Sequence, residues 1–135
     1  MMYYSTNRQT PLVTLKEAVV KGLAADKGLF MPEKINKFDN SFFDNIEKLS
    51  FREIAFEVAS KFFSEDVPVE NLREIVYDTL PFDCPVVQVR ENIYSLELFH
   101  GPTLAFKDIG ARFMARLLNF FLREGDEEVN VLVAT

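Results

Sequence analysis

The sequence predicts a mixed α/β protein in which a mostly helical first part, residues 1–80, precedes the start of a parallel sheet in residues 81–135. Three observations support this class. Capping patterns and apolar residues at helical spacing dominate the first part. The stretch "PFDCP" then places two prolines in five residues, which interrupts the helical pattern. After it come a β-rich run, a long amphipathic stretch and a second apolar run, the order of a strand, a crossover helix and a parallel strand.

Capping patterns predict where the helices of the first part begin. Thr14–Glu17 and Ser50–Glu53 have the spacing of capping boxes, and Gly22 marks the end of the first helix. Pro68 fits the first turn of a later helix. "ADKGLFMPE" reads as a turn. The predicted helical stretches are therefore residues 14–22, 42–49, 50–62 and 69–80.

The second part starts near Pro81, where we expect a domain boundary. Residues 93–99 are rich in β-favouring side chains and are predicted to form a strand. Residues 104–124 have helical periodicity, and residues 129–134 form a second apolar run. We expect the two strands to lie parallel, with the helix crossing between them.

Composition excludes several classes of function. A net charge of −6 supplies no basic patch for nucleic acid. No apolar run has the length of a membrane span, and residues 1–11 lack the apolar centre of a signal peptide, so we expect a cytoplasmic protein. One cysteine, Cys84, and one histidine, His100, exclude a multi-ligand His/Cys metal site. Cys84 is predicted to be a small buried side chain.

One lysine in the long amphipathic stretch breaks its pattern. At 100° per residue, Lys107 lies roughly 140° from the centre of the polar stripe. It also stands in the first helical turn, where the helix dipole disfavours a cation. The polar stripe holds Asp108, Arg112, Arg116, Asn119 and Arg123, the apolar side holds Phe106, Ile109, Phe113, Leu117 and Phe120, and Lys107 lines up with Gly110, Ala111, Met114 and Leu118.

Two interpretations of Lys107 follow from the pattern. In the first, its stem runs along the protein and its amine reaches solvent. In the second, the side chain points inward, where burial at the positive end of a helix lowers the pKa of an ammonium group. The freed amine could then attack a carbonyl and form a Schiff base. The small residues Gly110 and Ala111 would leave space beside it. Its place just beyond the carboxyl end of a predicted strand is where open α/β sheets bind ligands.

The segment "LELFHGPTLAFKDIGARF", residues 96–113, closely resembles the lysine segment of the threonine synthase family. The opening "YYSTN" and the stretch "GLAADKGLFMPE" resemble the start of the same family. The resemblance implies a fold type II, tryptophan synthase beta-like domain that binds pyridoxal 5'-phosphate after a helical amino-terminal domain. It also implies that Lys107 is both the catalytic and the cofactor-binding residue, and that the substrates are O-phospho-L-homoserine and water, converted to L-threonine and phosphate.

Neighbouring residues have structural interpretations beside functional ones. His100 could contact substrate or cofactor, or could be a turn histidine bonded to the backbone. Thr103 is first a candidate helix N-cap and second a ligand contact. Asp108 suits the positive end of a helix whatever the function. Phe106 is expected in the core rather than against a cofactor ring.

The resemblance also implies that residues needed for activity follow Thr135, because the family continues there into a loop that holds the cofactor phosphate. We therefore expect a truncated, amino-terminal piece that is inactive alone and that associates with itself through uncovered apolar surface. Two alternatives stay open. One is another enzyme of the same cofactor fold, such as a dehydratase, and the other is a non-catalytic interaction module.

Overall fold

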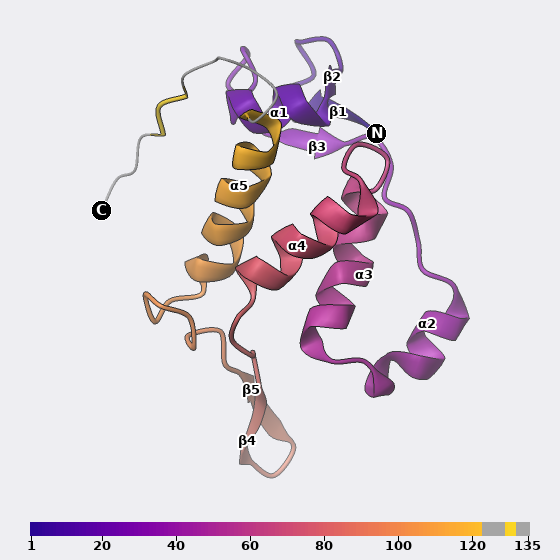
Figure 1. The fold of residues 1–135 in the computed structure, drawn as a ribbon, viewed down its shortest axis with the longest axis vertical. Helices are drawn as coiled ribbons and strands as arrows, with labels where there is room; N and C mark the ends of the chain where they lie inside the picture. Colours follow the sequence, from indigo (N-terminus) through magenta and orange to yellow (C-terminus); the bar gives the residue numbers. More distant parts are fainter. Residues whose placement is uncertain (123–128, 132–135) are drawn as a thin grey trace.

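The computed structural model describes residues 1–122 and 129–131. Figure 1 shows the first three strands and the first helix at one end of the molecule, with three longer helices beside them. The mixed α/β class is confirmed. The elements are β1 (Met2–Ser5), β2 (Val13–Thr14), α1 (Leu15–Lys21), β3 (Phe30–Pro32), α2 (Asn40–Asn45), the 3₁₀ turn η1 (Ile46–Lys48), α3 (Phe51–Phe63), α4 (Val69–Thr79), β4 (Val86–Arg90), β5 (Ile93–Leu96) and α5 (Lys107–Leu122).

A small antiparallel sheet near the amino terminus has the strand order β2–β1–β3. Tyr3 in the central strand lies opposite Val13 on one side and Pro32 on the other. Tyr3 and Ser5 point into the protein and are 6% and 0% exposed. The sequence does not predict this sheet, and "ADKGLFMPE" is predicted only as a turn, because strands of two to four residues are too short to establish a period.

The two predicted capping boxes differ in the structure. At the start of α3, Ser50 Oγ accepts the Glu53 backbone N–H at 3.3 Å, and Glu53 Oε2 accepts the Ser50 N–H at 2.7 Å. This box is confirmed. At the start of α1, Thr14 Oγ1 accepts the Glu17 N–H at 3.2 Å, but the Glu17 carboxylate bonds to Lys21 at 2.6 Å. Only half of that box forms, because a lysine one turn further on takes the carboxylate.

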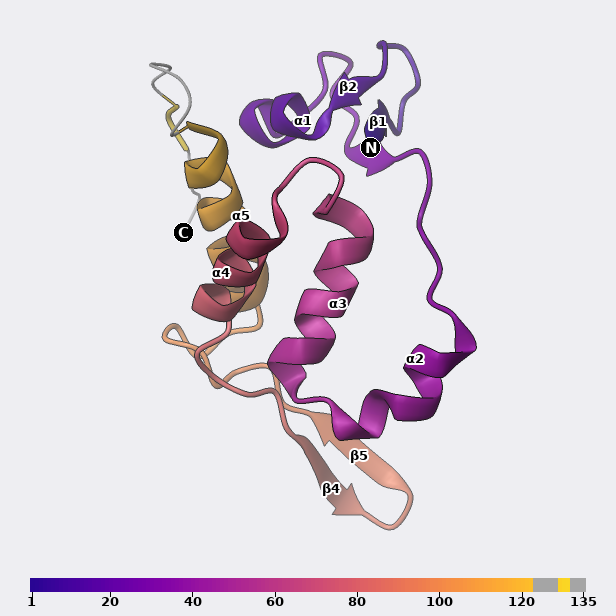
Figure 2. The same ribbon diagram turned by 45° about the vertical axis from the view of Figure 1, so that its right-hand side comes forward.

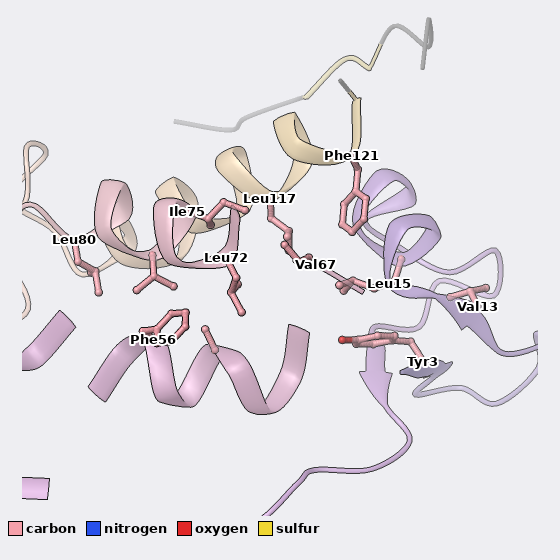
Figure 3. Close-up of a cluster of buried hydrophobic side chains, with 13 residues drawn as sticks. Tyr3, Val13, Leu15, Phe56, Val67, Leu72, Ile75, Leu80, Leu117 and Phe121 are labelled. Atoms are coloured by element: carbon pink, nitrogen blue, oxygen red, sulfur yellow. The ribbon is translucent and has the colours of Figure 1, made fainter. Parts of the chain in front are cut away.

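The hydrophobic core joins the sheet to four helices. Figure 3 shows Leu72, Phe56 and Leu117 between α3, α4 and α5, while Leu15 and Tyr3 continue the cluster toward the sheet. Helix α5 belongs to this core, because Leu117 and Phe121 are 4% and 5% exposed within it. The predicted helices at 50–62 and 69–80 are thus confirmed, and both contribute buried side chains to this core.

We expect the stability of the core to depend most strongly on the side chain of Leu72. It is fully buried at 0% exposed. Leu72→Ala should lower the free energy of unfolding by about 2–5 kcal/mol, since the cavity it leaves can close only in part. Leu23→Ala is the matched control, because Leu23 is 55% exposed. Urea denaturation followed by circular dichroism compares them, and equal losses for the two variants would contradict the described core.

The Met1 amine ties β1 to the loop between α3 and α4. It lies 2.9 Å from Glu65 Oε2 and 3.0 Å from Asp66 Oδ2. The hydrogen bonds that it donates to these carboxylates, the one to Glu65 first, raise the pKa of the amine above its ordinary value of 8.0. The higher folded pKa means that the stabilisation is complete below about pH 8 and is lost as the pH rises through the folded pKa.

This ion pair predicts a pH-dependent stability. Between pH 7 and pH 10 the chain with a free Met1 amine should lose more stability than an amino-terminally acetylated chain, because acetylation removes the titrating group. Urea unfolding at both pH values measures the difference. Parallel losses in the two chains would mean that the contacts with Glu65 and Asp66 contribute nothing.

The strand predicted at 93–99 is present but shorter, as β5, and it pairs with β4 in an antiparallel hairpin. Figure 2 shows this hairpin projecting from the helices. Both sheets in the described residues are antiparallel. Residues 129–131 form no strand, so the second strand predicted at 129–134 is wrong for this part, and residues 132–134 lie outside the described residues. The parallel pairing of 93–99 is therefore not formed with residues 129–131 and stays a prediction for residues 132–134.

Candidate functional site

Lys107 is the first residue of α5, at the end of the loop that leaves β5. The helix predicted from residue 104 begins three residues later, because Leu104 has a φ of +56°, which a right-handed helix cannot contain. Lys107 is exposed, as are Gly110 and Ala111 one turn on. The inward orientation expected for Lys107 is therefore wrong for the described residues.

The polar stripe of α5 explains this correction. Arg112 Nε donates to the Thr79 carbonyl and Arg112 Nη2 to the Asp78 carbonyl, both at 3.0 Å. These carbonyls belong to the last turn of α4, where helical partners are missing. The polar stripe thus packs against α4, and the row that begins with Lys107 faces outward. Phe106, expected in the core, is 72% exposed, because it precedes the first residue of α5 and so does not share the buried apolar side of that helix.

Asp108, the residue after the candidate lysine, is a buried carboxylate at 4% exposed. Its Oδ2 accepts the Thr103 backbone N–H at 2.9 Å, and its Oδ1 accepts the Thr103 hydroxyl at 2.8 Å. Burial alone would raise the pKa of Asp108. The hydrogen bonds from Thr103, the backbone of Ala105 and the charge of Arg112 outweigh it and lower the pKa below the ordinary value.

The loop before Lys107 closes on this carboxylate. A Cβ atom added at Gly101 would lie 2.4 Å from Asp108 Oδ2, so only glycine allows this approach. The Leu104 N–H donates to the Gly101 carbonyl at 3.0 Å, which completes a turn. Thr103 is not the N-cap expected for the helix, and its hydroxyl bonds to Asp108 instead.

His100 lies on the exposed side of the same loop. Its Nε2 is 2.7 Å from Glu97 Oε2, and its ring stacks on Phe99 with centroids 4.8 Å apart. The partner of His100 is thus a side chain three residues back and not the backbone. Cys84 is buried as predicted, and burial, followed by the charge of Asp83, raises the pKa of its thiol.

Two open apolar grooves of about 400 Å³ each flank α5. One runs between α3, α4 and α5 and includes Phe51, Val58 and Gly110. The other runs between the small sheet, α1 and α5 and includes Phe30 and Met114. Lys107 lines neither groove. The described residues thus place its amine at an accessible helix end, outside both grooves.

The described residues offer one feature that would suit pyridoxal phosphate, an accessible amine for a covalent link. The Lys107 amine is exposed, and a Cβ added at Gly110 would meet no atom within 4 Å, so the surface one turn on is open. Among residues 1–122 and 129–131, no group of three His, Cys, Asp or Glu side chains could hold a metal ion. No helix in these ranges has the length and apolarity to cross a membrane.

Comparisons with known proteins agree over the whole chain. A family profile described as "Threonine synthase N terminus" matches residues 2–80. Threonine synthase of Escherichia coli (strain K12) is 38% identical over 135 residues, which is 100% of this chain and 31% of that protein. Threonine synthase of Saccharomyces cerevisiae is 37% identical over 134 residues, covering 90% of this chain and 26% of that protein.

Solved structures give the same result for the fold. The crystal structure of Escherichia coli threonine synthase superposes with a TM-score of 0.84 at 38% identity, covering 90% of this chain and 28% of that one. The structure of PLP-bound threonine synthase from Brucella melitensis gives a TM-score of 0.85 at 33% identity, covering 92% and 28%. The chain spans about a third of the length of the relatives it matches. Since the profile matches more than half of its residues, the chain belongs to the threonine synthase amino-terminal family.

Proposed function

We propose that this chain is the amino-terminal part of a threonine synthase, a PLP-dependent lyase that converts O-phospho-L-homoserine and water to L-threonine and phosphate. The observation that carries the proposal is the match over the entire chain, lysine segment included, to proteins named threonine synthase. One structural relative is described as PLP bound. We further propose a cytoplasmic enzyme with a domain boundary near Pro81.

Lys107 would perform two tasks in this reaction. Its amine would hold the cofactor aldehyde through a covalent link, and the same group would move protons at the substrate Cα and Cβ once the substrate amine had taken its place. Pyridoxal phosphate, when bound, supplies the ring that stores the carbanion electrons. The outward position of Lys107 suits the first task, because the amine is free to meet a cofactor carried by the rest of the protein. That covering part would also exclude water from the amine.

A product assay on the full-length protein tests this proposal. Incubation with O-phosphohomoserine and pyridoxal phosphate should release threonine and phosphate in equal amounts. A dehydratase of the same cofactor fold would instead form ammonia and a 2-oxo acid from threonine. A non-catalytic interaction module would form neither set of products. Either of these last results would overturn the assignment.

Uncovered apolar surface in the 135-residue chain predicts self-association. The β4–β5 hairpin exposes Val86, Val89 and Tyr94 at 60–65%, and the two grooves beside α5 are lined largely by apolar side chains. Such surface drives association unless another part of a protein covers it. Light scattering over a concentration series should show a rising mean mass, together with binding of a hydrophobic dye. A monomeric chain that binds no dye would contradict the proposal that a further part of the enzyme covers these surfaces.

A further inference from the structure

The contacts of the Asp108 side chain differ from those that an acid in the first turn of a helix usually makes. A carboxylate there favours the positive helix end even when it is exposed to solvent. Glu53 in the first turn of α3 is such a case, since it is exposed and bonds only to its own N-cap residue. Asp108 is buried and bonds back to Thr103, five residues earlier. Its contacts therefore fix the path of the loop as well as the helix end.

The loop held by Asp108 determines where Lys107 lies. Among the described residues, no hydrogen bond or ion pair holds the Lys107 amine, so its direction depends on the backbone from which it extends. That backbone is the junction of the loop and α5. The junction is closed by the Thr103 bonds to Asp108 and by the close approach of Gly101, and it includes the positive φ of Leu104. A non-glycine residue holds such a conformation only where its surroundings impose it.

We infer that Asp108 is a positioning residue for Lys107. Asp108 accepts two hydrogen bonds from Thr103 and lies close to Gly101, and these contacts fix the first turn of α5. The lysine amine then meets the cofactor aldehyde in one orientation. This inference rests on the proposed function. Attack on an aldehyde depends on orientation, and a displacement of about 1 Å can cost about a hundredfold in rate. A small aldehyde that needs no binding site imposes no such requirement.

The test compares two reactions of the same amine in full-length protein freed of cofactor. Added pyridoxal phosphate followed by borohydride reports the oriented reaction at Lys107, and formaldehyde with borohydride reports simple accessibility. Peptide mapping quantifies both products at Lys107. Asp108→Ala should lower the ratio of the first rate to the second by about tenfold or more. Asp108→Asn should keep most of the ratio, because its amide oxygen can still accept the Thr103 N–H.

Two further variants keep the result interpretable. Thr103→Val removes only the hydroxyl bond, so it should lower the ratio in the same direction but by less, even if Asp108→Ala folds poorly. Glu53→Ala, the matched first-turn carboxylate on α3, should leave the ratio unchanged. The positioning role would be overturned if Asp108→Ala and Thr103→Val both left the ratio unchanged. That outcome includes an equal slowing of the pyridoxal phosphate and formaldehyde reactions. A wild-type protein that takes no pyridoxal label at Lys107 would overturn the proposed function and the positioning role together.

Discussion

Replacing Lys107 with alanine in the full-length protein should reduce threonine formation to background, a loss of at least about 10³-fold. Under the proposed function, the change removes both the covalent link to the cofactor and the proton-transfer group. It should leave the fold intact, because Lys107 is exposed and its side chain packs against neither groove beside α5. Steady-state rates and circular dichroism together separate a loss of chemistry from a loss of structure.

Two controls sharpen this prediction. Lys107→Arg keeps the positive charge, but a guanidinium stays protonated and cannot form the imine, so it should fail like alanine. Lys16→Ala removes another exposed lysine from the first turn of a helix, α1, and should keep full activity. Appreciable turnover by Lys107→Arg would show that the charge and not the nucleophile matters, which contradicts the assignment.

Gly28→Ala adds a single methyl group, and we expect it to be the most destabilising such addition in the amino-terminal sheet region. An added Cβ would lie 2.0 Å from Ser5 Oγ and 2.9 Å from the Asn7 backbone nitrogen. Ser5 is fully buried and donates to Asp26 Oδ1 at 2.6 Å, so it cannot move without breaking that bond. The free energy of unfolding should fall by about 2 kcal/mol or more through overpacking and the lost hydrogen bond.

Gly110→Ala is the matched control for this prediction. The same methyl group at Gly110 would meet no atom within 4 Å, and Gly110 lies within α5. Alanine favours a helix over glycine by about 1 kcal/mol, so the 135-residue chain should gain a little stability. Urea denaturation of both variants gives the comparison. A Gly28→Ala chain as stable as the wild type would mean that the network around Asp26 is not formed as described.

The helical half of the fold could be predicted from local signals. Ser50 and Glu53 form a box whose two hydrogen bonds need only the spacing of the residues, and Pro68 opens α4 at the expected place. The β1–β2–β3 sheet could not be predicted, because its very short strands are specified by contacts such as Tyr3 with Pro32 that are distant in the sequence. Only tertiary pairing defines strands of that length.

The candidate site was predictable in position but not in orientation. Helical periodicity separated Lys107 from the polar stripe and from the apolar side of α5, and the structure keeps this separation. The inward orientation of Lys107 is wrong because the polar stripe packs against α4, where Arg112 binds carbonyls of its last turn. Nothing local to α5 signals those acceptors, since they lie more than thirty residues away in the sequence. The bonds from Thr103 to Asp108 could not be predicted, because an acid at a helix start already has a general explanation.

Reduction of the full-length holoprotein with borohydride, followed by proteolysis and mass spectrometry, would identify the lysine that holds the cofactor. Borohydride makes the lysine–cofactor link permanent, so the labelled peptide identifies the residue that carried it. We expect the pyridoxyl group on the peptide that contains "LAFKD", at Lys107, in nearly all of the protein. A label at Lys16, Lys61 or a lysine outside this chain, with Lys107 unmodified, would show that Lys107 is not the cofactor lysine.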